Sequence, residues 1–167
     1  MSDFAGVWRL DGAPVEQAHL HCLGQALDAR GIGPVRVWQD GAVAIVHRQR
    51  VVTAEDAGEA MPLVGESGAV LAADVVLAAR AELGDALGRP CSRDDTDGAL
   101  LLEALQRWDL AALQRVYGSY ALALYRPDRQ RLLLARDPVG LRSLFVHRGP
   151  RLRAALGASP AARPAPR

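Results

Sequence analysis

The chain of 167 residues has few cysteines and almost no net charge. Its two cysteines, Cys22 and Cys91, lie far apart and show no metal-ligand spacing. We therefore expect ordinary thiols, and neither a disulfide framework nor a metal site. With 20 basic and 19 acidic residues the net charge is +1, and this balance predicts no nucleic-acid or membrane-surface partner.

Long apolar runs and a secretory signal are also missing. Residues 68–79 form one of the most apolar stretches, but they include Asp74 and are too short to cross a bilayer. Residues 1–4 lack the basic and then apolar regions of a signal peptide, so we expect a cytoplasmic protein with no membrane partner. Hydrophobic residues make up 50% of the chain, which is enough to bury the core of one domain.

The pattern of apolar residues predicts an α+β domain with mainly antiparallel sheets. Alternating runs predict strands at residues 4–10, 35–38, 42–47, 68–73, 119–125, 131–135 and 143–148. Helical spacing predicts helices at residues 15–30, 75–83, 97–108 and 110–117.

Local signals refine this outline. An Asp-Gly pair at residues 40–41 favours a β-hairpin. Asp74 and Thr96 are predicted N-caps of the second and third helices. The last residues are mostly Ala, Pro and Arg without periodicity. We therefore predict that residues 1–150 form the domain and that residues 151–167 form a disordered tail.

Three segments are distinctive. Residues 4–8 read Phe-Ala-Gly-Val-Trp, and residues 95–101 read Asp-Thr-Asp-Gly-Ala-Leu-Leu before the strand at 120–124. Residues 134–145 contain Ala-Arg-Asp-Pro-Val-Gly-Leu-Arg-Ser-Leu. Together they resemble the glutaminase domain of asparagine synthetases, a type-2 glutamine amidotransferase of the N-terminal-nucleophile class. The family signature has a proline where Ser143 stands here.

The resemblance covers residues 2–150 approximately. Within this family it most resembles the asparagine-synthetase-like cyclases of lasso-peptide pathways, whose glutaminase domains have often lost catalytic residues. It implies a four-layer αββα sandwich with antiparallel sheets. It also implies that Arg136 and Asp137 belong to a largely structural segment, in which they would form a loop-fixing ion pair.

The family mechanism uses a nucleophile on the residue that follows the initiator Met, with its own α-amino group as the base. Here that residue is Ser2, and its small size favours removal of Met1. A hydroxyl ionises far less easily than the thiol that this branch of the family uses. In addition, the carboxylate of Asp3 would tend to keep the α-amino group protonated and weaken it as a base.

An Asn-Gly pair forms the oxyanion hole in the family, and alignment on the helix after it places this pair at Ala73 and Asp74. Ala73 offers no side-chain donor, and Asp74 would add negative charge where negative charge must develop. For the glutamine clamp, Asp95 matches the family aspartate, and the arginine is Arg50 or Arg48, with Arg50 preferred. A helix N-terminal charge for Asp95 and a solvated strand residue for Arg50 remain alternatives.

The sequence contains no ATP-binding Ser-Gly-Gly loop, so we expect the synthetase domain of the family to be absent. The resulting hypothesis is an inactive amidotransferase-like module that supports an ATP-dependent synthetase or cyclase in trans. Glutamine or a related amino acid is the expected ligand, if any, and no cofactor is expected. The alternative is a Ser2-dependent N-terminal amidohydrolase that releases ammonia from glutamine.

Overall fold

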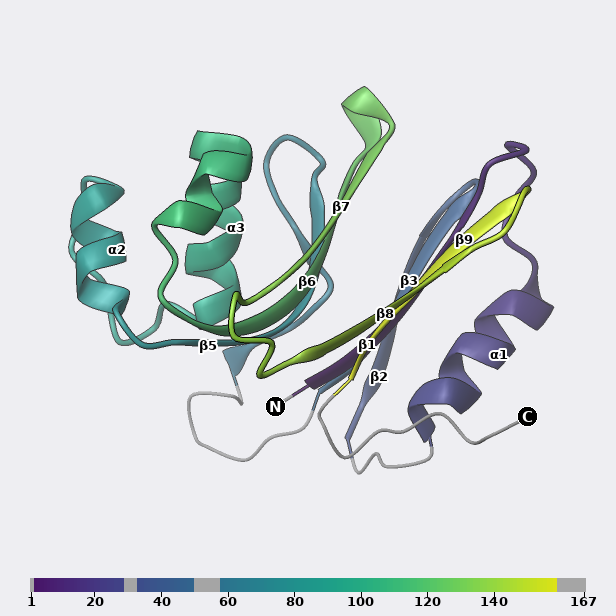
Figure 1. Ribbon diagram of the computed structural model, residues 1–167, viewed down its shortest axis with the longest axis horizontal. Helices are drawn as coiled ribbons and strands as arrows, with labels where there is room; N and C mark the ends of the chain where they lie inside the picture. The colour runs from purple at the N-terminus through teal and green to yellow at the C-terminus, as the bar shows by residue number, and fades with distance from the viewer. Residues whose placement is uncertain (1, 29–32, 50–57, 159–167) are drawn as a thin grey trace.

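The computed structural model describes residues 2–28, 33–49 and 58–158. In these ranges the chain forms two antiparallel sheets and three α-helices (Figure 1). None of the described helices is both long enough and apolar enough to span a bilayer. The helices are α1 (Gln17–Asp28), α2 (Arg80–Ala86) and α3 (Asp97–Trp108), and a 3-10 turn, η2 (Asp109–Gln114), follows α3.

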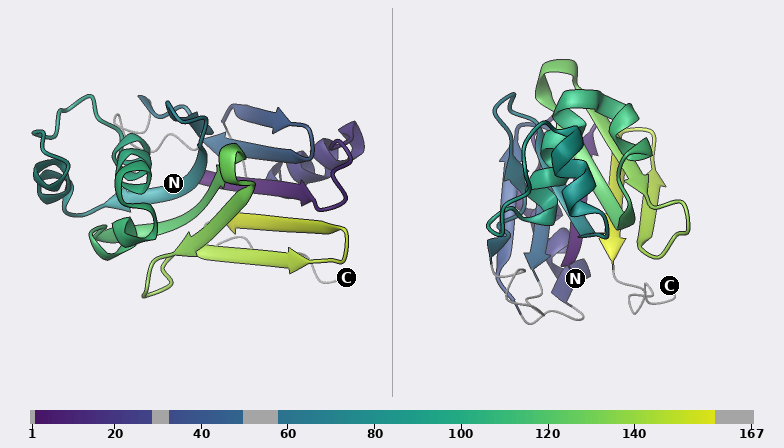
Figure 2. Two further views of the ribbon diagram at one scale, coloured as in Figure 1. Left: turned by 90° about the horizontal axis from the view of Figure 1, so that it is seen from above. Right: turned by 90° about the vertical axis from the view of Figure 1, so that its left-hand side faces the viewer.

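The five-stranded sheet has the strand order β2-β3-β1-β9-β8. Its strands are β1 (Ser2–Arg9), β2 (Val35–Asp40), β3 (Val43–Gln49), β8 (Ser143–Arg148) and β9 (Leu152–Ala158). Figure 2 shows β9 between β1 and β8, so the first and last strands of the described chain are neighbours. The predicted Asp-Gly hairpin is confirmed, because Asp40 pairs with Val43 across the turn.

The four-stranded sheet has the order β4-β5-β6-β7. Its strands are β4 (Leu63–Val64), β5 (Val70–Leu77), β6 (Gly118–Arg126) and β7 (Arg131–Arg136). The short 3-10 turn η3 (Pro127–Arg129) joins β6 to β7. Every pairing in both sheets is antiparallel, as the sequence predicts.

Apolar side chains from both sheets form one core between them, around the fully buried Phe4 and Val70. The other face of β5 and β6 packs against α2 and α3, where Leu101 and Leu105 are fully buried. Helix α1 packs on β1 and β3 through Leu20, Leu23 and Leu27, the face that helical spacing predicts. Both faces are therefore covered at the centre of each sheet, whereas the edge strands β2 and β8 are largely exposed.

Two predictions are wrong, and a third, the helix at residues 110–117, is in the structure the 3-10 turn η2, which ends at Gln114. Asp74 does not cap a helix but lies within β5, which continues to Leu77 because Val75, Val76 and Leu77 pair with β6. Helix α2 begins only at Arg80, and its N-cap residue makes no side-chain cap bond. The predicted N-cap Thr96 is confirmed, since its side chain accepts from the Ala99 N–H at 3.2 Å.

The second error concerns the C-terminal segment. We expected a disordered tail over residues 151–167, whereas residues 152–158 form β9 and pair with both β1 and β8. Its short, Ala-rich side chains give no alternating pattern, and Ala has little preference for strands, so the local sequence does not indicate one. Residues 159–167 lie outside the described residues.

Candidate functional site

The structure brings Ser2 and Asp74 together, although they belong to different sheets. Ser2 begins β1, and its backbone N–H donates to Oδ1 of Asp74 in β5 at 3.0 Å. Both residues are buried, and the Asp74 side chain points into the space between the sheets. The predicted nucleophile position and one of the predicted oxyanion positions are therefore in direct contact.

Ala73 does not join this contact. Because successive strand residues face opposite sides, its methyl group points to the core around α3. Its backbone N–H donates to Sδ of Met61 at 3.1 Å. Neither its side chain nor its backbone N–H is therefore directed at Ser2.

Arg142, which lies in the loop after β7, is the third residue of this polar cluster. Its Nη1 lies 3.2 Å from Oδ2 of Asp74, and both side chains are buried. Burial raises the pKa of Asp74, and the charge of Arg142 together with the Ser2 N–H partly offsets this effect. Asp74 is thus a buried carboxyl group that is paired on one oxygen and hydrogen-bonded on the other.

Asp137 holds the loop that presents Arg142. Its carboxylate accepts from the backbone N–H groups of Leu141 at 3.0 Å and Arg142 at 3.2 Å. Burial raises the pKa of Asp137, but these backbone donors outweigh it, so the pKa is lowered overall. The loop-fixing role implied for this residue is therefore seen, with backbone amides as its partners in place of Arg136.

His47 is a buried residue of the same region that the sequence analysis did not identify. It lies on β3, directly opposite Phe4, and is 1% exposed. Burial lowers its pKa to about 4, and the Ala73 backbone opposes this effect. An imidazole that is neutral at physiological pH is thus placed next to the strand that carries Ser2. Nothing in the local sequence around His47 distinguishes it from an exposed strand histidine.

The two residues predicted to clamp glutamine, Asp95 and Arg50 or Arg48, are not brought together with Ser2 in the described part of the chain. Asp95 accepts from Nη1 and Nη2 of Arg89 at 2.8 and 3.2 Å, and from the Ser92 N–H at 2.7 Å. The bond from Arg89 and the one from Ser92 lower the pKa of Asp95. Arg89 also pairs with Glu103 at 2.7 Å. The carboxylate of Asp95 is therefore already bound by an arginine beside α3.

Arg50, the preferred arginine of the clamp, lies outside the described residues. The alternative, Arg48, is buried on β3 and pairs in register with Asp3. Because strand faces alternate, Arg48 and Asp3 lie on the opposite face from His47. Arg48 is therefore directed away from the space that Asp74 faces. Among the described residues, no group of His, Cys, Asp and Glu could hold a metal ion.

Comparison with known proteins identifies the family of this domain. Residues 47–162, more than half of the chain, match the model of the family described as glutamine amidotransferase domain. Proteins from Mycobacterium bovis and from two strains of Mycobacterium tuberculosis carry the provisional name of a glutamine-hydrolyzing asparagine synthetase. Each is 38% identical over 55 residues, which make up 33% of this chain and 8% of the relative.

The matched region contains Asp74 and the loop from Asp137 to Arg142, and Ser2 lies outside it. The similarity to the mycobacterial proteins involves only a small part of their length, so it bears on the domain and not on those proteins as a whole. With its two antiparallel sheets and a family match over most of its length, this chain belongs to the glutamine amidotransferase domain family.

Proposed function

We propose that this domain is a catalytically inactive glutamine amidotransferase domain of the four-layer N-terminal-nucleophile type. In this proposal it serves as a structural or partner module for an ATP-dependent amide-forming synthetase or lasso-peptide cyclase. The observation that carries the proposal is the position of Asp74, which binds the Ser2 nitrogen and pairs with Arg142.

A carboxylate in contact with the Ser2 nitrogen opposes its use as a base. If Met1 is removed, this nitrogen becomes an α-amino group, and an adjacent negative charge stabilises its protonated form. The N-terminal mechanism needs the neutral amine to take the proton of the nucleophile. The contact at 3.0 Å therefore favours an N-terminus held as a structural ion pair.

The same carboxylate opposes formation of an oxyanion. Attack on an amide builds negative charge, which preorganised donors must stabilise. Asp74 presents acceptor oxygens between the sheets, and Arg142, the nearest cationic side chain, already contacts Oδ2 of Asp74. In this cluster the positive charge of Arg142 is thus already balanced by Asp74 before a second anion forms.

An exposed apolar surface supports the partner role. Val139, Leu141, Tyr117 and Val76 are 80%, 58%, 66% and 47% exposed, respectively. They lie near the ends of strands β5 to β7 from which the Asp137 loop extends. Contiguous exposed apolar side chains are typical of interaction surfaces. The mycobacterial relatives are named as synthetases, and this chain aligns with only 8% of their length.

A glutaminase assay tests the loss of catalysis. We expect the protein that begins at Ser2 to release no ammonia from glutamine above background. We also expect Ser2→Cys alone to stay inactive, because Asp74 remains. The triple variant S2C, D74N and R142M should gain measurable activity, since it supplies the thiol and removes both charges; circular dichroism would check its folding.

The alternative, a Ser2-dependent amidohydrolase, makes the opposite prediction. It is favoured by the position of Ser2 at the start of β1, with its nitrogen in a buried polar cluster. Release of glutamate by the wild type that disappears in Ser2→Ala would establish it. Activity in Ser2→Cys alone would show that Asp74 does not block the site.

Co-purification tests the partner role. An ATP-dependent synthetase encoded beside this gene should co-purify with the tagged wild type, and Val139→Ser with Leu141→Ser should weaken capture. Val37→Ser is the matched control, because Val37 is 53% exposed on the edge strand β2. If the Val139→Ser, Leu141→Ser variant captured as much synthetase as the Val37→Ser control, the assignment of this surface would be wrong.

A further inference from the structure

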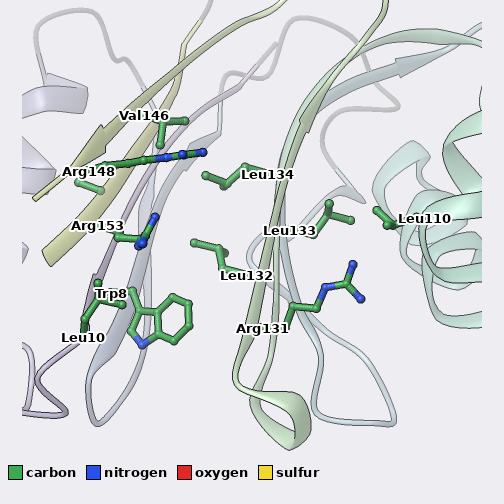
Figure 3. A pocket seen from close by; sticks show the side chains of 11 residues that line it. Trp8, Leu10, Leu110, Arg131, Leu132, Leu133, Leu134, Val146, Arg148 and Arg153 are labelled. Carbon is green, nitrogen blue, oxygen red and sulfur yellow. The ribbon is translucent and has the colours of Figure 1, made fainter. Parts of the chain in front are cut away.

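A second site lies between the sheets, far from Ser2 along the strands. A cavity of about 470 Å³ opens between β7 on one side and β8 and β9 on the other (Figure 3). Trp8 lines it and lies six positions after Ser2 on the extended strand β1, which corresponds to about 20 Å. Its size falls within the range of small-molecule sites.

The walls of this cavity are apolar on both sheets. Leu132 and Leu134 project from β7 toward Trp8 and Val146 on the five-stranded sheet (Figure 3). These residues continue the core between the sheets, which is filled by side chains further along the strands. A ligand here would therefore place an apolar body against leucine and tryptophan side chains.

Two arginines give the cavity its charge. Arg148 on β8 and Arg153 on β9 are directly opposite each other in register, and Figure 3 shows both side chains on the cavity side of the sheet. Like charges in directly opposed strand positions repel each other. In the described part of the chain neither forms an ion pair, and the cavity lining contains no acidic residue. Arg131, the third arginine, pairs with Asp109 at 3.2 Å.

We propose that this cavity binds a small organic carboxylate with an apolar body. Arg148 and Arg153 bind the carboxylate, which relieves their mutual repulsion, and the guanidinium geometry suits such a group. The apolar body packs between Leu134 and Trp8. The site is separate from the Ser2 cluster and does not depend on whether the domain hydrolyses glutamine.

Titration calorimetry with octanoate tests the site on the full chain. We expect octanoate to bind and octanol and octylammonium to bind far more weakly. Arg148→Gln and Arg153→Gln should each weaken octanoate binding about tenfold, the effect of losing one charge-assisted hydrogen-bonded contact. The octanoate affinity of Arg148→Lys should lie between that of the two Gln variants and that of the wild type. Lysine keeps the positive charge but lacks the planar guanidinium that binds both carboxylate oxygens.

Arg151→Gln is the matched control, since Arg151 lies in the same β8–β9 hairpin but does not line the cavity. It should bind octanoate as the wild type does. Equal affinity in the wild type, Arg148→Gln and Arg153→Gln would overturn the proposal and show that these side chains only extend into solvent. Equal binding of octanol and octanoate would also overturn it, because the arginines would then contribute nothing.

Discussion

Arg142 and Asp74 are each tolerated in a buried position because the other is there. Arg142→Met would leave Asp74 buried without its cationic partner, and breaking such a pair costs roughly 3–5 kcal/mol. Since the pKa of Asp74 is already raised by burial, the loss should be greatest above that pKa and should shrink as acid protonates the carboxyl group.

Urea unfolding at several pH values checks this prediction. The double variant Asp74→Asn with Arg142→Met should recover most of the stability at neutral pH, because no buried charge remains. If Arg142→Met alone were as stable as the wild type at pH 7, the ion pair would be unimportant for the fold.

His47 predicts a different pH dependence. Its pKa is lowered from 6.5 to about 4, so between these pH values His47 is protonated in the unfolded chain and neutral in the folded chain. The stability that neutral His47 contributes is complete above pH 6.5 and is lost as the pH falls toward 4. This loss amounts to about 3 kcal/mol.

The measurement is the difference in unfolding free energy between wild type and His47→Gln across this pH range. We expect the difference to narrow on acidification, because the variant lacks the titrating group. His147→Gln is the control, since His147 is exposed on β8. Parallel pH profiles for wild type and His47→Gln would contradict the prediction.

Some of these residues could be found from the sequence and others could not. Ser2, Asp74 and Asp137 stand at recognisable motif positions. Arg142 and His47 do not, because their roles depend on burial and on partners distant in the chain. An aspartate before apolar residues fits both a helix cap and a strand, and only the pairing of Asp74 with β6 shows that it belongs to a strand.

Among the elements, β9 depends most on a close fit. Gly157 lies opposite Phe4 in register, and a Cβ at this position would overlap the Phe4 ring. Gly157→Ala should therefore lower the unfolding free energy by roughly 1–3 kcal/mol through overpacking. Thermal unfolding would measure the change.

Gly24→Ala provides the control for that substitution. Gly24 lies in α1, and a Cβ there would meet nothing within 4 Å. Because alanine favours helix more than glycine does, this variant should be at least as stable as the wild type. If Gly157→Ala had the same melting temperature as Gly24→Ala, the Phe4 ring would have to move aside at little cost in free energy.

At the scale of elements, the sequence predicts best where local signals suffice. The Asp-Gly hairpin and the Thr96 cap each depend on a few adjacent residues, and both are confirmed. Strand β9 carries no such signal, because Ala154 and Ala155 are compatible with helix, strand or coil. Its structure comes from two neighbouring strands that are far away in the sequence.

For the whole molecule, β9 places the end of the folding unit beyond residue 150. A chain of residues 1–150 should lose cooperative unfolding, because β8 loses its pairing with β9, and β1 becomes an exposed edge. A chain of residues 1–158 should unfold like the full chain. Circular dichroism melts of the two chains test this, and a sigmoidal melt of the shorter chain at the full-length temperature would refute it.

The neighbouring positions of β1 and β9 also set an order of events during synthesis. The first strand leaves the ribosome early, but its second partner follows only when residues 152–158 have emerged. Until then the edge of β1 that pairs with β9 has no partner. Closure of the five-stranded sheet therefore waits until nearly all of the described chain has been synthesised.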